Sequence, residues 1–174
     1  MAKIVRGGKG GTIMPAIMTA ISLMALVAVL KYLNLNLIHG VGYSAIIFAS
    51  FGGSAFLLFM MPEEKASDTR RFVKSYIIGG IIGVISSFIL QYLGVFVAVG
   101  ISIFAASMLL AKTDSMHPPG IAMVFAFIIY KVDYPSIILV VAGVAIMVVI
   151  RLFLEKAIFI IEKDIERSGK KAGR

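Results

Sequence analysis

Met116-His117-Pro118-Pro119-Gly120 lies between two long apolar stretches and contains two consecutive prolines followed by a glycine. Prolines have no backbone N–H and are tolerated only in the first turn of a helix, so one helix must end before this stretch and another must begin in it. In a membrane every backbone N–H and C=O needs a partner, so such a break must be buried in protein or must line a polar cavity. This stretch therefore organises the fold and is the first candidate for a functional site.

The composition on either side of this stretch is that of an integral membrane protein. Of the 174 residues, 60% are apolar and 15% are charged, and long windows carry no charge at all. The window from Ser75 to Ala111 is too long for one crossing, and Gln91-Tyr92-Leu93-Gly94 in its middle predicts a turn. We expect an all-α, polytopic membrane helix bundle of six hydrophobic segments. The expected helices lie near residues 13–31, 37–61, 72–92, 95–112, 119–131 and 136–161.

The basic residues predict how the chain is oriented and divided. With a cytoplasmic N-terminus, fifteen of the 17 lysines and arginines fall inside, among them Lys3, Arg6 and Lys9, whereas Lys31 and Lys131 fall outside. Both termini are then cytoplasmic. Residues 1–161 are expected to form one transmembrane domain and residues 162–174 a basic cytoplasmic tail. The net charge of +8 is explained by topology and by attraction to membrane lipid, so no nucleic-acid partner is expected.

Two of the six segments look short or broken. Residues 37–61 are interrupted by Ser50-Phe51-Gly52-Gly53-Ser54, and residues 118–130 would span only about 20 Å as a helix, against a hydrocarbon core of roughly 30 Å. A short charged connection and a glycine-containing apolar helix follow each of them. Because the two elements would run in opposite directions, the pattern suggests an inverted repeat of three segments each.

These two stretches also carry a family resemblance. Ala49 to Ala55 with Leu57-Leu58-Phe59, then Pro62 and the His-Pro-Pro motif at 117–119, resemble the HPP family of integral membrane proteins over roughly residues 13–155. The resemblance implies four transmembrane helices as the alternative to six segments. It also implies transport of a small inorganic anion, nitrite above all, because plant and cyanobacterial members are implicated in nitrite transport. Gly53 and Gly120-Ile121-Ala122 depart from the residues that relatives often carry, and this leaves the substrate open.

The chemistry of the two stretches fits an anion site. A helix that starts below the membrane surface directs its positive end and its free N–H groups into the protein. One helix end does not offset the burial of an ion, so we expect both stretches to face one cavity, with His117 coupling proton uptake to anion binding. The prolines remove two donors, which leaves the Gly120 and Ile121 N–H groups on one side and the hydroxyls and N–H groups of the 50–54 stretch on the other. The expected substrate-binding residues are His117, Pro118, Pro119, Gly120, Ile121, Ser50, Gly52, Gly53 and Ser54.

Other interpretations of the same residues stay open. The proline pair could simply end one helix and start another, with His117 as an N-cap bonded to its own backbone, and residues 50–54 could be a surface for close helix packing. A non-transporting membrane adaptor or sensor is the alternative function. An enzyme is not expected, because Asp114, Ser115 and His117 have no second histidine, cysteine or intramembrane carboxylate nearby to complete a triad or a metal site. We expect no cofactor, and we expect the chain to form homo-oligomers.

Overall fold

The structure is a computed structural model of the chain and describes residues 12–37, 44–132 and 137–172. These residues form helices and turns with no strand among them, which agrees with the all-α prediction. The elements are α1 (Ile13–Leu37), α2 (Ser44–Met60), the short 3-10 helix η2 (Lys65–Ser67), α3 (Thr69–Lys112), α4 (Pro118–Ile129) and α5 (Ile137–Ala172). The N-terminal basic residues at 3, 6 and 9 lie outside the described part of the chain.

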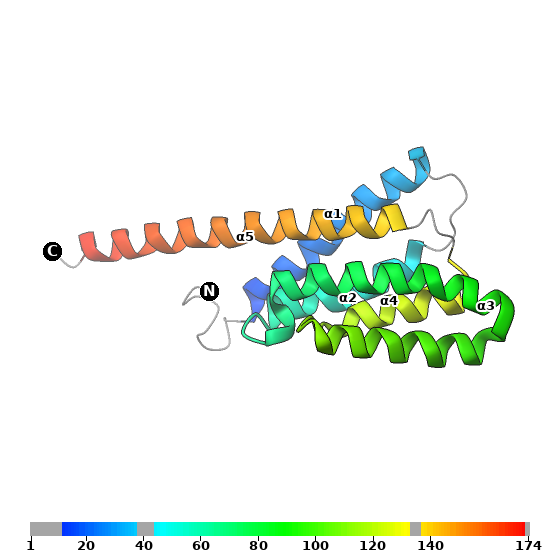
Figure 1. Cartoon of the computed structure of the whole chain (residues 1–174). Coiled ribbons are helices and arrows are strands. Elements are labelled where there is room, and N and C mark those ends of the chain that lie inside the picture. The colour runs from blue at the N-terminus through cyan, green and yellow to red at the C-terminus, as the bar shows by residue number, and fades with distance from the viewer. Residues whose placement is uncertain (1–11, 38–43, 133–136, 173–174) are drawn as a thin grey trace.

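Helix α3 turns back on itself at Gly94. Its 44 residues contain one non-helical position, Gly94, with φ 77° and ψ 170°. A positive φ costs glycine little and other residues much more, so this is the position where the chain can reverse most easily. Figure 1 shows the two arms of α3 running side by side in opposite directions. The predicted turn at residues 91–94 is confirmed.

Helix α2 runs without interruption through residues 50–54, so the predicted break there is wrong. A break would leave backbone N–H and C=O groups unpaired in an apolar setting, which costs more than the roughly 1 kcal/mol by which each glycine weakens a helix. The N–H groups of Gly52, Gly53 and Ser54 therefore lie inside a regular helix. Only the side chains of this stretch are available for other contacts.

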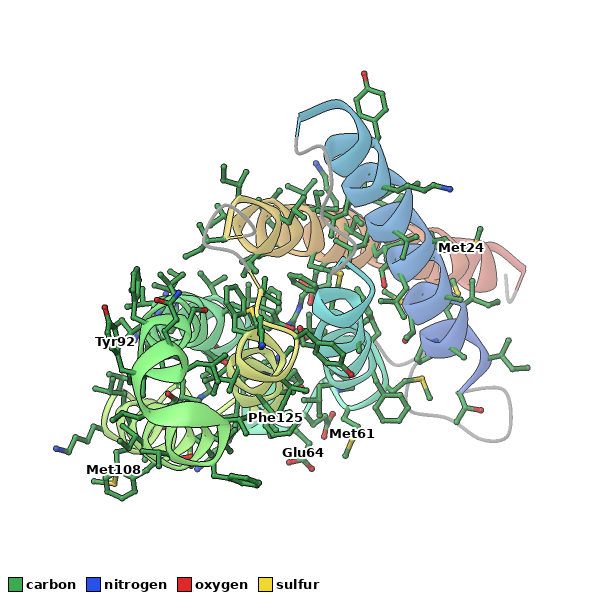
Figure 2. All side chains as sticks on the ribbon, turned by 90° about the vertical axis from the view of Figure 1, so that its right-hand side faces the viewer. Met24, Met61, Glu64, Tyr92, Met108 and Phe125 are labelled. Atoms are coloured by element: carbon green, nitrogen blue, oxygen red, sulfur yellow. The ribbon has the colours of Figure 1, made fainter. Side chains whose placement is uncertain are left out.

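Helix α4 is short, as the sequence predicts, and begins at the proline pair. Its 12 residues start at Pro118 and end at Ile129. Figure 2 shows α4 lying between α3 and α2. Met123 and Phe127 of α4 join the buried core together with Phe51 of α2 and Phe72 and Tyr76 of α3. The start of α4 is thereby fixed against both neighbouring helices.

Three helical stretches are long and apolar enough to cross a membrane: Ile13–Tyr32, Thr69–Lys112 and Ile137–Ala157. Many large apolar side chains point outward from them, as Met24 and Phe96 do with 73% and 91% of their surface exposed. Helices α2 and α4 are shorter. The choice between six segments and four spans stays a prediction. So does the inverted repeat, which loses one of its grounds because α2 is unbroken.

Helix α5 is longer than expected. The sequence predicted that the last helix ends near residue 161, but α5 continues to Ala172. Figure 1 shows its C-terminal part extending well beyond the other helices. The residues assigned to a basic tail thus continue the last helix through position 172.

Candidate functional site

The side chain of His117 lies between α2 and η2 at the start of α4. His117 is the N-cap residue of α4, but its side chain makes no capping hydrogen bond, so the interpretation of His117 as a cap bonded to its own backbone is wrong. Its Nδ1 atom is 2.6 Å from the carbonyl oxygen of Ala66 in η2. Its Nε2 atom is 2.8 Å from Oγ of Ser54 in α2. The imidazole thus joins α4 to α2 and η2, which lie more than fifty residues earlier in the sequence.

From Ser54 the hydrogen bonds continue to α3. Ser54 Oγ is 2.9 Å from the hydroxyl oxygen of Tyr76, which is 3.2 Å from Oγ of Ser50. We call this connected set, from the Ala66 carbonyl through His117, Ser54 and Tyr76 to Ser50, the polar chain. The side chains of Ser54, His117 and Tyr76 are at most 1% exposed, and that of Ser50 is 4% exposed. The polar chain is therefore enclosed within the helix bundle.

The Ala66 carbonyl determines which nitrogen of His117 carries the proton. A carbonyl oxygen can only accept, so Nδ1 must donate its N–H to Ala66. In the neutral imidazole Nε2 then has no proton and accepts the hydroxyl proton of Ser54. Nε2 can become a donor only if His117 takes up a second proton, and the Ser54 and Tyr76 hydroxyls then turn to suit. The same geometry thus accommodates two protonation states.

Burial favours the neutral state of His117. Desolvation lowers the pKa of the imidazole below its usual value, and the hydrogen bond to the Ala66 carbonyl opposes this shift. The ring of Phe72 meets His117 edge-on at a centroid distance of 5.4 Å, and Phe51 stacks on Tyr76 at 4.7 Å. These aromatic rings line the polar chain and account for its low exposure.

The backbone of the His-Pro-Pro-Gly stretch is pressed against α3. Ser75 Oγ donates to the His117 carbonyl at 3.1 Å, and the Gly120 N–H donates to the same carbonyl at 2.9 Å. A Cβ atom at Gly120 would lie 1.8 Å from Ser75 Oγ, and one at Gly79 would lie 2.6 Å from the Gly120 carbonyl oxygen. Gly120 therefore serves close packing, and its N–H is not the free donor that the sequence suggested.

The remaining predicted site residues differ in how close they lie to the neighbouring helix and to the polar chain. Gly53 lies against Pro119, since a Cβ atom built at Gly53 would be 3.2 Å from Pro119 Cγ. A Cβ atom at Gly52 would have no neighbour within 4 Å. Pro118 is exposed and Ile121 is half-buried, and neither belongs to the polar chain. The two stretches meet through Ser54 and His117 directly and through Gly53 and Pro119 by packing.

Tyr76, Ser75 and the Ala66 carbonyl belong to the site but are not among the residues predicted from the sequence. Tyr76 has a recognisable signal, because it lies three, four and seven residues before Gly79, Gly80 and Gly83 and so shares their helix face. A tyrosine on a closely packed face needs a partner for its hydroxyl. The Ala66 carbonyl carries no comparable signal, since any residue type could supply it.

The connector between α2 and α3, which contains η2 and Ala66, is held in place by hydrogen bonds to α2 and α5. Ser67 Oγ donates to the carbonyls of Leu57 and Met61, at 2.7 Å and 2.6 Å, so the connector is tied to the end of α2. The guanidinium of Arg151 in α5 donates to the Ser67 carbonyl and pairs with Glu155. The acceptor for His117 is therefore held in place independently of α4.

Asp114, Ser115 and His117, the residues weighed for an enzyme, bond to different partners. Asp114 accepts from the Arg71 guanidinium at the start of α3, and the Ser115 hydroxyl lies against that of Thr113. His117 instead faces Ser54. The three side chains do not converge on one point.

Comparison with protein families identifies the family of this chain. Residues 9–160 match the family described as HPP, transmembrane region. The chain belongs to the HPP family. Comparisons with curated proteins and with solved structures found no match. This HPP protein is a multi-pass integral membrane protein, and its His-Pro-Pro motif is the one that begins α4.

A disulfide between α2 and α4 would test how the two stretches meet. The Cβ atom built at Gly53 is 3.7 Å from Cβ of Pro119, within the range of roughly 3.5–4.5 Å found in disulfides. Because the chain has no cysteine, we expect the Gly53→Cys/Pro119→Cys double variant to form one intramolecular disulfide on mild oxidation. Loss of thiol labelling, reversed by a reductant, measures it.

The matched control is Gly52→Cys/Pro119→Cys, because a Cβ atom at position 52 has no atom of α4 within 4 Å. This control should keep both thiols under the same oxidation. Equal crosslinking of both pairs, or of neither, would show that α2 and α4 do not meet as described.

Proposed function

We propose that this HPP protein transports a small inorganic anion and that nitrite, which the family resemblance suggests, is the first candidate. The observation that carries the proposal is the polar chain, in which Ser54, His117 and Tyr76 are buried together in an apolar bundle. Polar and ionisable groups inside a membrane protein are costly and mostly mark substrate or proton pathways. Packing alone would be served by small apolar residues at these positions.

The polar chain offers an anion the right kind of groups. Ser54 and Tyr76 each have a rotatable hydroxyl, and His117 has a ring nitrogen pointing at the same place. An anion that enters between Ser54 and His117 would replace their mutual hydrogen bond and could accept from all three side chains. Without the anion these groups satisfy one another, which keeps the site closed without an unpaired polar atom.

This arrangement links anion binding to a proton. Since Nδ1 donates to the Ala66 carbonyl, Nε2 can donate to an anion only in the doubly protonated imidazole. A bound anion raises the pKa of His117, which burial lowers in the free protein. Binding therefore takes up a proton, and the affinity for the anion rises as the pH falls until free His117 is itself protonated. We infer that the anion and a proton move together.

The distribution of charge supports a cytoplasmic position for this end of the bundle. Figure 1 shows η2, the two ends of α3, the start of α4 and the far end of α5 at one end of the molecule. The basic residues of these segments include Lys65, Arg70, Arg71, Lys74, Lys112 and Lys163. Lys131 follows α4 at the opposite end. By the positive-inside rule the polar chain lies toward the cytoplasm, and both termini are cytoplasmic.

Uptake into liposomes tests the proposed function. Purified protein is reconstituted and offered nitrite, nitrate, formate or chloride, with protein-free liposomes as the control for passive leak. We expect uptake above the control, with nitrite fastest. No uptake of any of the four anions would favour the alternative of a membrane adaptor or sensor. In that case the polar chain would only stabilise the contacts between the helices. Homo-oligomer formation remains part of the proposal and can be measured on the same sample by mass.

A further inference from the structure

A second polar feature lies far from the polar chain, at the end of the bundle where α3 reverses direction. A pocket of about 830 Å³ opens there, between the two arms of α3 and the C-terminal end of α4. Figure 2 views the molecule from this end, with the turn of α3 and the end of α4 facing the reader. The polar residues that line the pocket are Ser87, Gln91 and Lys131, and its other lining residues are apolar or glycine.

Lys131 occupies an unusual backbone conformation at this pocket. Its φ is 51°, in the left-handed region where glycine is the common residue. The Val132 N–H donates to the Phe127 carbonyl at 3.0 Å and the Lys131 N–H faces the Ile128 carbonyl at 3.4 Å, which is the Schellman arrangement that ends many helices. Glycine would end α4 in the same way with less strain. A lysine at this position therefore suggests that its side chain has a binding role.

The end of α4 is held firmly against α3, so Lys131 has a defined place. Ser87 Oγ donates to the Val132 carbonyl at 3.3 Å, and Val132 is buried. In the part of the chain that the structure describes, no carboxylate pairs with Lys131. Lys131 therefore brings a cation to the lining of a mainly apolar pocket, and Gln91 lines the same pocket.

We propose that this pocket binds the headgroup of an anionic phospholipid. Lys131 would pair with the phosphate, Gln91 would add an amide donor, and the apolar wall of Val84, Phe88 and Val95 would take the upper part of an acyl chain. The pocket is far larger than a small inorganic anion, and its apolar wall matches a lipid better than a free ion. The turn of α3 places it at the end of the hydrophobic segments, where headgroups lie.

Native mass spectrometry of the full-length protein tests this site. Protein in detergent is mixed with phosphatidylglycerol or phosphatidylcholine, and the bound lipid is counted. We expect the wild type to retain phosphatidylglycerol in preference to phosphatidylcholine, and Lys131→Gln to lower that retention by about fivefold, the effect of one basic residue near a headgroup. Lys131→Arg should retain the lipid. Lys112→Gln, which removes a basic residue at the end of α3 outside the pocket, should behave as wild type.

Lys131→Gly separates lipid binding from folding. Glycine relieves the left-handed conformation, so this variant should melt at the same temperature as the wild type or higher, yet lose phosphatidylglycerol as Lys131→Gln does. Equal lipid retention by the wild type and both charge-removing variants would overturn the proposal. Displacement of the lipid by inorganic phosphate at low millimolar concentration, dependent on Lys131, would also overturn it, because the site would then take a free anion.

Discussion

Replacing Ser54 with alanine should lower anion uptake by between about tenfold and a hundredfold. Ser54 Oγ is the only atom that joins His117 to Tyr76 in the described hydrogen bonds, and it is fully buried. Its removal takes one donor from the proposed anion site, and a hydrogen bond to a charged group contributes about 1.5–3 kcal/mol. Nε2 of His117 would also face an apolar methyl group, which weakens the fold rather than the binding of the anion. Initial uptake rates in liposomes, per molecule of folded protein, measure the effect.

Ser102→Ala is the matched control for this variant. Ser102 is also a buried serine of a long helix, but its hydroxyl has no hydrogen-bond partner among the described residues. We expect its replacement to leave uptake unchanged and stability equal or slightly raised, because an unpaired buried hydroxyl is removed. If Ser54→Ala and Ser102→Ala transported at the same rate as the wild type, the polar chain would have no part in transport.

Replacing Gly79 with alanine should produce the largest loss of stability among replacements of the helical glycines of α3, which are Gly79, Gly80, Gly83 and Gly100. The added Cβ would lie 2.6 Å from the carbonyl oxygen of Gly120, a backbone atom in the first turn of α4 that cannot rotate away. Overpacking of this kind costs about 1–3 kcal/mol. With roughly 2–4 °C per kcal/mol for a chain of this size, we expect the Tm in detergent to fall by several degrees. The shift of α4 should also move His117 away from Ser54 and reduce uptake.

Gly100→Ala provides the comparison within the same helix. A Cβ atom at Gly100 meets nothing within 4 Å, so alanine there should raise the Tm slightly through its higher helix propensity. An unchanged Tm for Gly79→Ala would show that α3 and α4 are not in contact at this point.

The sequence was sufficient for features that depend on local chemistry. Gly94 marks the reversal of α3 because a positive φ favours glycine, and Pro118 marks the start of α4 because proline is tolerated at the first helical position. The cost of burying an ion, which one helix end does not offset, also led to the expectation that the two stretches meet, and Ser54 and His117 do so. These inferences needed no knowledge of distant contacts.

Features that depend on tertiary packing could not be predicted from the sequence. Gly52 and Gly53 weaken an isolated helix, yet α2 is unbroken because its backbone N–H and C=O groups must form hydrogen bonds within the helix. Gly53 also allows Pro119 to pack closely against α2. The partner of Nδ1 in His117 is a backbone carbonyl 51 residues away, supplied by a connector whose position depends on α2 and α5. No local pattern in the sequence specifies such an acceptor, so the nitrogen of His117 that carries the proton can be assigned only from the structure.

Simultaneous recording of nitrite and proton entry into liposomes tests the central claim most directly. We predict that a nitrite gradient drives proton uptake in parallel with nitrite, that the rate at about pH 6 exceeds the rate at about pH 8, and that Ser54→Ala loses both fluxes together. Protein-free liposomes correct for passage of the neutral acid. Protein-dependent nitrite uptake with no accompanying proton, at the same rate at both pH values, would contradict the account.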